Sequence, residues 1–150
     1  MKDFDPIVEI RNCASILDAG AWPNFHDAVV YSLKFWRGDM RPDDDVWVGP
    51  VIEASLELDA LEFPYVVDLR FHDCRDVRLA AFNHNNDICA LSFYFEHRGY
   101  YQDGVTPLMP AVRVIFEGFA DQQPMLEFRC FHVEAVGRRE ITAPPKDGSE

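Results

Sequence analysis

The chain has 150 residues, of which 48% are hydrophobic and 13% aromatic. This composition excludes a disordered chain and supports one folded domain with a sizeable core. Its 26 acidic and 14 basic residues give a net charge of −12, which argues against nucleic acids and anionic membranes as partners, because both are bound through Lys and Arg. No apolar run is long enough to span a bilayer, and the N-terminus lacks the pattern of a secretory signal. We therefore expect a cytoplasmic protein.

The first predicted element is an amphipathic helix near the N-terminus. Asp5 is a favourable N-cap, and Pro6 is a favourable first helical residue. Apolar residues then recur at helical spacing: Ile7, Ile10, Ala14 and Leu17. Gly20 is a suitable stop, and we expect this helix to pack on a sheet.

From Val29 onward the hydrophobic period changes to two, which is typical of β-strands. The segments with strand-like patterns are 29–36, 51–59, 67–71, 77–81, 88–96, 112–117 and 125–136. Segment 88–96 is apolar on both faces, which indicates a central strand. Two polar loops interrupt the series, and the one at 98–110 contains Tyr100 and Tyr101.

The order of these elements predicts an α+β fold. Helical crossovers are absent between the strands, so about seven strands should form a mostly antiparallel sheet beside the N-terminal helix. One helix cannot cover such a sheet, and we expect strong curvature or a second sheet layer to hide the rest. The domain is predicted to be a single unit over 1–140, followed by a loose, Pro-rich tail at 141–150.

Two His-Asp pairs are candidates for metal chemistry. Phe-His-Asp occurs at 25–27 and again at 71–73, and a hydrolytic metal site could use His26, Asp27, His72, Asp73 and His84. Both pairs fall at strand ends rather than on helices. The alternative is that these side chains cap turns and satisfy backbone groups.

A second metal hypothesis concerns the cysteines. His72 and Cys74 are two residues apart, as are Cys130 and His132, and residues at that spacing on a strand share a face. Two such pairs on neighbouring strands could form a zinc site, although structural zinc sites more often use two to four intervening residues. The simpler interpretation is two buried, reduced thiols with two His at the rim of the core. We expect no metal and no cofactor.

An acidic segment is the stronger indication of a binding surface. Glu53, Glu57 and Asp59 lie on one face of a predicted strand, and Asp43, Asp44 and Asp45 precede it. No basic residue lies within this segment to relieve the repulsion. These carboxylates either provide solubility and protection of an edge strand, or form a docking surface for a basic protein partner.

Two short motifs carry a resemblance to a known family. They are WPNFHDA at 22–28 and FNHNN at 82–86, and a Phe-x-Cys at 128–130 closes the pattern. The chain from 22 to 136 resembles the immunity protein 50 family of bacterial polymorphic toxin systems. The residues that match the family motifs are Trp22, Pro23, Phe25, His26, Asp27, Phe82, Asn83 and His84. The chain departs from the family at Val29, where an acid is common, and at Asn85, where Gln is common.

This resemblance implies a small cytoplasmic protein, encoded beside a toxin, that neutralises the toxin by binding it. No catalytic residues come with the family, and we expect no enzymatic activity. The acidic balance of the chain predicts a toxin with a basic surface. Two alternatives remain open at this point: the metal-dependent hydrolase described above, and a ligand-binding domain that uses Tyr100, Tyr101 or the Trp residues.

Overall fold

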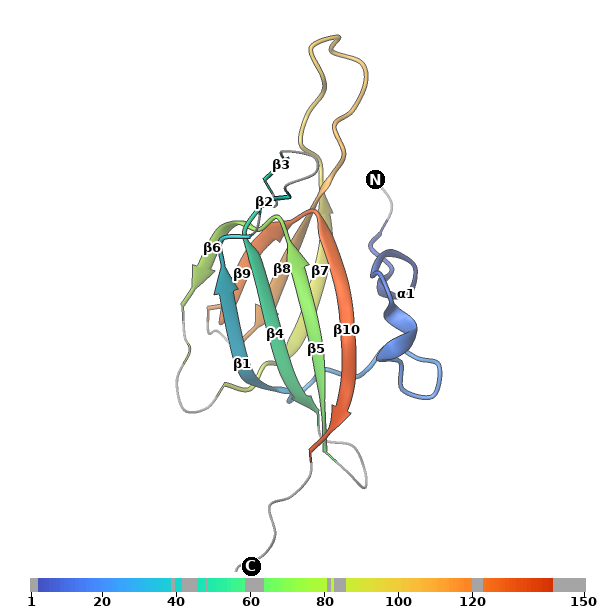
Figure 1. Ribbon diagram of the computed structural model, residues 1–150, viewed down its shortest axis with the longest axis vertical. Coiled ribbons are helices and arrows are strands. Elements are labelled where there is room, and N and C mark those ends of the chain that lie inside the picture. The colour runs from blue at the N-terminus through green and yellow to red at the C-terminus, as the bar shows by residue number, and fades with distance from the viewer. Residues whose placement is uncertain are drawn as a thin grey trace, which may run out of the picture.

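The computed structural model describes residues 3–38, 40–41, 46–47, 49–58, 64–80, 82, 86–119 and 123–141. Most of them form two four-stranded antiparallel sheets, one in front of the other in Figure 1. The first sheet has the order β1 (Val29–Trp36), β4 (Val51–Leu58), β5 (Tyr65–His72) and β10 (His132–Glu140). The second sheet has the order β6 (Arg75–Leu79), β9 (Leu126–Cys130), β8 (Ala111–Glu117) and β7 (Ala90–Glu96). With a short N-terminal helix, this is the predicted α+β class.

The core lies between the two sheets. Ile52 and Leu56 of β4 point into it and are fully buried, as their alternation with polar residues predicts. Phe71 of the first sheet meets Phe116 and Phe128 of the second, with ring centroids 6.2 and 4.9 Å from its own. Each such side chain contributes about 1.5–3 kcal/mol by leaving water, so this aromatic contact is a main link between the layers.

Two strands bend from one sheet into the other. β5 leads into β6 through Asp73 and Cys74, and β9 leads into β10 through the single residue Phe131. The two bends lie side by side, because the backbone N–H of Phe131 donates to the carbonyl of His72 at 3.0 Å. Segment 125–136, predicted as one strand, is therefore parts of two. The two sheets contain eight strands rather than about seven for this reason.

β1 contains a bulge that changes which side chains face the core. Its register with β4 shifts between Val30 and Ser32. Val30 is consequently buried, whereas Val29 and Tyr31 are exposed. The strict alternation predicted for this strand fails here because a bulge inserts one residue and reverses the phase.

β7 is an edge strand, and the prediction that 88–96 is central is wrong. Only β8 pairs with it among the described strands. Its apolar side chains are covered by the N-terminal segment instead: Phe4 stacks on Phe93 at 5.0 Å and packs against Phe95 at 5.2 Å between ring centroids.

The N-terminal helix is much shorter than predicted. α1 spans Pro6–Glu9, with the side chain of Asp5 accepting from the backbone N–H of Ile7 as an N-cap. The chain then leaves the helix because Arg11 pairs with β10, donating to the carbonyl of Val133 at 2.9 Å. A 3₁₀ turn, η1 (Cys13–Ser15), follows. The helical spacing of apolar residues thus continues where the backbone is no longer helical.

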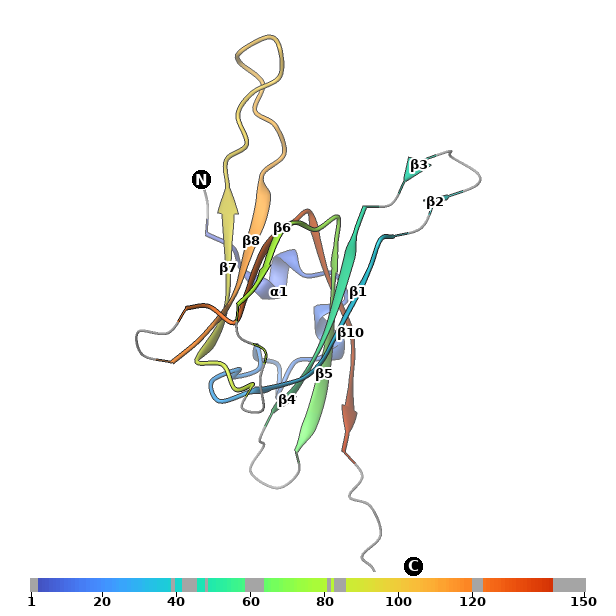
Figure 2. The same cartoon turned by 90° about the vertical axis from the view of Figure 1, so that its left-hand side faces the viewer.

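Two hairpin-like segments leave the same end of the sandwich (Figure 2). One contains the short strands β2 (Met40–Arg41) and β3 (Val46–Trp47) between β1 and β4, and the other joins β7 to β8 over 97–110. Of the tail predicted at 141–150, only Ile141 is described, and its backbone N–H donates to the carbonyl of Pro64 at 3.3 Å. None of the helices in the described ranges has the length and apolar character needed to cross a membrane.

Candidate functional site

The WPNFHDA motif packs the end of the sandwich opposite the two hairpins, which we call the base. Phe25 is 4% exposed, and its ring lies 5.3 Å from that of Trp22 between centroids. Trp22 in turn contacts Phe93 of β7 edge-on at 6.0 Å. Pro23 is also buried. The aromatic part of the motif therefore serves the core rather than an open surface.

The polar part of the same motif shapes a turn. Asn24 accepts from the backbone N–H of His26 at 3.0 Å, and Asp27 has a φ of +65°. Asp and Asn tolerate this left-handed conformation better than most residues. Nδ1 of His26 lies 2.9 Å from the carbonyl oxygen of Cys89. Because a carbonyl oxygen only accepts, Nδ1 is the donor in this contact.

The structure brings the two family motifs together. The backbone N–H of Val30 donates to the carbonyl of Asn86 at 2.8 Å, and that of Asp27 donates to Ile88 at 2.9 Å. The chain after the first motif therefore pairs with the chain that ends the second. Phe82 is exposed, while Asn83 and His84 lie outside the described residues. The described parts of the two motifs therefore hold the start of β1 beside the segment that leads into β7, through backbone hydrogen bonds.

The two His-Asp pairs lie far apart. His26 precedes β1, whose Val29 stands opposite Glu57 of β4, whereas His72 stands opposite Val51 at the other end of β4. Six residues of strand separate these positions, a distance of about 20 Å. Among the described residues, no group of three or more His, Cys, Asp or Glu side chains is arranged to hold a metal ion. His84, the fifth residue of that hypothesis, is not among them.

The four residues of the zinc hypothesis also divide between two places. His72 and His132 are opposite each other in the register of β5 and β10, and Nε2 of His72 lies 2.9 Å from a carboxylate oxygen of Glu134. Cys74 and Cys130 are buried at 3% and 0% exposure. Burial raises the pKa of the Cys74 thiol to about 12 and also raises the pKa of the Cys130 thiol. The simpler interpretation, two protonated core thiols with His at the rim, describes this arrangement.

The predicted acidic face is a mixture of charges. Arg70 of β5 donates to Glu53 from Nε at 3.1 Å and from a terminal nitrogen at 2.8 Å. Lys34 of β1 stands opposite Glu53 on its other side, and Glu134 of β10 stands opposite Arg70. The repulsion expected from sequence is therefore relieved by neighbouring strands, which the local sequence does not reveal.

The remaining acidic positions divide as follows. Glu57 is partly exposed on the same face. Asp43, Asp44, Asp45 and Asp59 lie outside the described residues. β4 itself is an internal strand between β1 and β5, so the interpretation that its acids protect an edge strand is wrong.

Most residues of the 97–110 hairpin are exposed. Its two sides pair through Tyr101, whose backbone N–H donates to Thr106 at 2.9 Å, and through Leu108, which donates to Gly99 at 2.9 Å. The ring of His97 contacts that of Tyr100, with 5.1 Å between centroids. These bonds hold the loop in one shape although it projects from the body of the fold (Figures 1 and 2).

Asp103 organises the tip of this hairpin. Its carboxylate accepts from the backbone N–H groups of Val105 and Thr106, both at 2.9 Å, and from the Thr106 hydroxyl. The hydroxyl contact and then the two backbone contacts lower the pKa of Asp103, because they stabilise its charged form. The hairpin nevertheless leaves large apolar groups in solvent: Tyr100, Tyr101, Val105 and Met109 are all more than half exposed.

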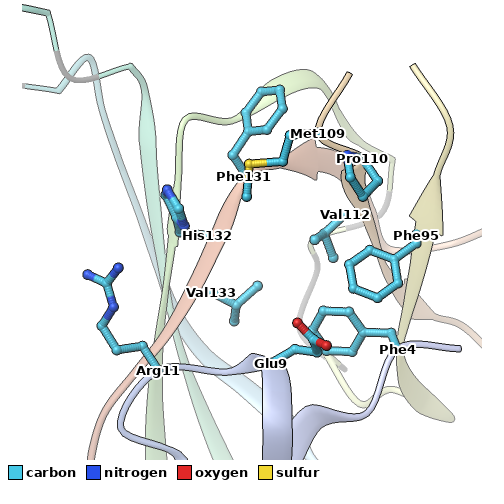
Figure 3. Close-up of a pocket in the computed structure, with 10 residues that line it drawn as sticks. All are labelled: Phe4, Glu9, Arg11, Phe95, Met109, Pro110, Val112, Phe131, His132 and Val133. Atoms are coloured by element: carbon cyan, nitrogen blue, oxygen red, sulfur yellow. The ribbon is translucent and has the colours of Figure 1, made fainter. Parts of the chain in front are cut away.

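A small hollow lies where the hairpin meets the body (Figure 3). The side chains of Phe4, Phe95, Met109, Val112 and Phe131 line its apolar part. Glu9, Arg11 and His132 stand at its polar side. Its volume is about 140 Å³, well below the roughly 300 Å³ at which pockets for drug-sized ligands begin. The hollow is suited to a single side chain rather than to a substrate.

These features define a class: a two-layer antiparallel β-sandwich with a packed base and an ordered, apolar hairpin at the opposite end. Sequence reasoning identified 98–110 only as a loop with two Tyr, and the Tyr pair was its one visible signal. Comparison with family models, with curated proteins and with solved structures found no match. The resemblance to the immunity protein 50 family stays a prediction.

Proposed function

We propose that the chain is an immunity protein that binds a cognate bacterial toxin in the cytoplasm and neutralises it by tight stoichiometric association, without catalysis. The observation that carries the proposal is the 97–110 hairpin. Exposed Tyr side chains are frequent energetic centres of protein interfaces because they bury a large area with few rotatable bonds. A patch of apolar groups on a projecting element also marks an interaction site more often than chance exposure does.

The order within the hairpin strengthens this argument. A flexible loop loses conformational freedom on binding, which weakens the complex. Here Asp103 and the cross-hairpin bonds at Tyr101 and Leu108 already hold the loop in place. The hairpin is thus suited to enter a groove or active-site cleft of a protein without a large ordering cost.

The charge of the chain supports a partner with a basic surface. At a net charge of −12, the field of the whole chain speeds the approach of a cationic protein. Asp43, Asp44 and Asp45 are in sequence between β2 and β3, the other segment at the hairpin end. They therefore stay the proposed electrostatic contacts. Glu57 stands opposite Val29 at the base, and Glu53 already has Arg70 as its ion-pair partner, so neither belongs to the contact proposed at the hairpin end.

The direct test is neutralisation. The open reading frame next to the gene would be expressed under tight control, alone and together with this chain. We expect the neighbour to stop growth when alone and growth to be restored by co-expression, with a 1:1 complex in size-exclusion chromatography with light scattering. Unrestored growth, or substrate turnover by this chain that one point substitution abolishes, would contradict the proposal.

A further inference from the structure

A second hollow, on the second sheet, is unusually rich in arginine for so acidic a chain. Arg75 of β6, Arg98 at the start of the 97–110 hairpin, Arg129 of β9 and the ring of Phe131 line it, and we call it the arginine hollow. Its volume is about 200 Å³. The residues come from three separate elements and the Phe131 bend, so the fold rather than a local sequence motif assembles this site.

The strand register places like charges side by side here. Arg75 stands opposite Arg129, and Arg129 stands opposite Arg113 of β8. Like charges directly opposite one another on neighbouring strands are destabilising. Such a row needs nearby anions, and the chain's own carboxylates neutralise only some of these arginines.

Two arginines of this row, Arg129 and Arg113, form ion pairs with carboxylates of the same sheet. Glu96 accepts from Nε of Arg129 at 2.9 Å and from a terminal nitrogen at 3.1 Å. Glu127 lies 2.7 Å from Arg113. The hollow therefore already contains one guanidinium–carboxylate pair, Arg129 with Glu96, which holds the Arg129 side chain in position.

Arg75 and Arg98 are held by an aromatic ring instead. Their guanidinium carbons lie 5.2 and 4.5 Å from the ring centroid of Phe131. Arg98 also donates to the carbonyl of Met109 at 3.2 Å. Neither Arg75 nor Arg98 forms an ion pair with a carboxylate among the described residues. Stacking on a ring leaves the in-plane N–H donors of a guanidinium available for a ligand.

The chemistry of these donors selects the ligand. A planar carboxylate is satisfied by a single bidentate arginine, as Glu96 is by Arg129. A tetrahedral phosphate group presents oxygens in several directions, so it suits guanidinium groups that converge from different elements around one hollow. We propose that the arginine hollow is a phosphate-binding site, in which Arg75 and Arg98 contact the anion and Arg129 completes the cationic wall.

The negative charge of the whole chain does not prevent such binding. At physiological ionic strength, charges more than about 8 Å away are largely screened. The carboxylates that line the hollow are those of Asp76 and Glu96, against three guanidinium groups, so the local balance is positive. The proposal does not rest on the proposed toxin-binding role, because phosphate binding needs no protein partner, although Arg98 belongs to the same 97–110 hairpin.

The test is a titration of the isolated protein with inorganic phosphate. Ionic strength is kept constant with chloride, and binding is followed by NMR of the arginine Nε–H and backbone amide signals. We expect saturable one-site shifts centred on Arg75, Arg98 and Phe131. The variants R75Q and R98Q should each weaken binding about tenfold, the change that the loss of roughly 1.4 kcal/mol produces. R78Q, on the same strand as R75Q but outside the hollow, should bind within about twofold of the wild type.

Three outcomes would overturn the proposal. The NMR shifts do not saturate with phosphate, R78Q loses as much phosphate affinity as R75Q and R98Q do, or succinate binds as tightly as phosphate. Thermal unfolding of each variant confirms that the fold is retained. A parallel titration with glycerol 3-phosphate separates the two sources of the group: tighter binding than inorganic phosphate assigns the site to a phosphate ester, and weaker binding assigns it to the free ion.

Discussion

The base and the 97–110 hairpin occupy opposite ends of β7, and they use aromatic side chains in opposite ways. At the base, Trp22 packs against Phe25 and against Phe93 of β7. In the hairpin, the side chains of Tyr100 and Tyr101 stand in solvent on a backbone that hydrogen bonds hold, among them those of Tyr101 itself. The difference teaches that a conspicuous sequence motif can belong to the core, while the surface available for binding carries no motif. Substitutions in the packed parts of the fold should therefore change stability, whereas substitutions in the hairpin should change binding.

The largest expected effect is at the base. Phe25→Ala removes a nearly fully buried ring and should reduce the free energy of unfolding by about 3–5 kcal/mol, measured by urea denaturation. Phe82→Ala is the matched control, because Phe82 belongs to the other family motif but is exposed, and it should cost less than about 0.5 kcal/mol. Equal losses in the two variants would contradict the assignment of the first motif to the core.

A second stability effect is expected where the β2–β3 segment joins the body. A Cβ at Gly49 would lie 1.8 Å from a carboxylate oxygen of Asp73 and 3.1 Å from its Cα. Gly49→Ala should therefore destabilise the fold by about 1–3 kcal/mol, as overpacking usually does. In an Asp73→Gly background the same substitution should cost measurably less, because the side-chain contact is gone. A cost that is unchanged in that background would show that the carboxylate is not the obstacle.

The hairpin should respond in binding rather than in stability. Tyr101→Ala should weaken toxin binding by about 1–2 kcal/mol, measured by calorimetry, with little change in the unfolding midpoint. Tyr94→Ala provides the control, because Tyr94 is an exposed tyrosine on β7 outside the hairpin. If Tyr94→Ala weakens binding as much as Tyr101→Ala, the contact surface lies on the sheet and not on the hairpin.

The smallest effect concerns the pH dependence of the hairpin tip. The pKa of Asp103 is lowered in the folded state, first by the Thr106 hydroxyl and then by the backbone N–H groups of Val105 and Thr106. The order that Asp103 provides is therefore fully present at neutral pH, and it is lost as the pH falls through that lowered pKa. The hydrogen-exchange protection factors of the Val105 and Thr106 amides should fall in acid before those of the core amides do. A simultaneous fall would mean that the tip has no separate transition.

Much of the first sheet could be predicted from the sequence, because the alternation of apolar and polar residues lies within each strand. In β4, Ile52 and Leu56 alternate with polar residues and face the core as predicted. The bend at Phe131 leaves only one trace in the sequence. The period of two continues on both sides, but the buried positions change from Leu126, Phe128 and Cys130 to Val133 and Ala135. The edge position of β7 was hidden for a different reason. Phe93 and Phe95 share the core-facing side of β7 and are covered by Phe4, which lies about 90 residues earlier in the chain. Tyr94, on the other side of the strand, is half exposed.

The candidate sites were harder to predict from the sequence than the fold was. The acidic pattern around Glu53 is plain in the sequence, but Arg70 reaches it only through the pairing of β4 with β5. The arginine hollow likewise depends on register: Arg75 and Arg129 are far apart in sequence and become neighbours only in the sheet. Charge balance on a sheet is a property of cross-strand rows, which a single linear pattern does not contain.

The bend at Phe131 also has a consequence for biosynthesis. β5 lacks one neighbour until β10 has been made, and Arg11 finds its backbone partners only at Val133 and Ala135. Pairings between residues so distant in sequence form slowly, and an unpaired strand edge is a template for aggregation. A nascent chain on the ribosome is therefore vulnerable just before β10 emerges, when most of the first sheet has been translated and one side of β5 is still open.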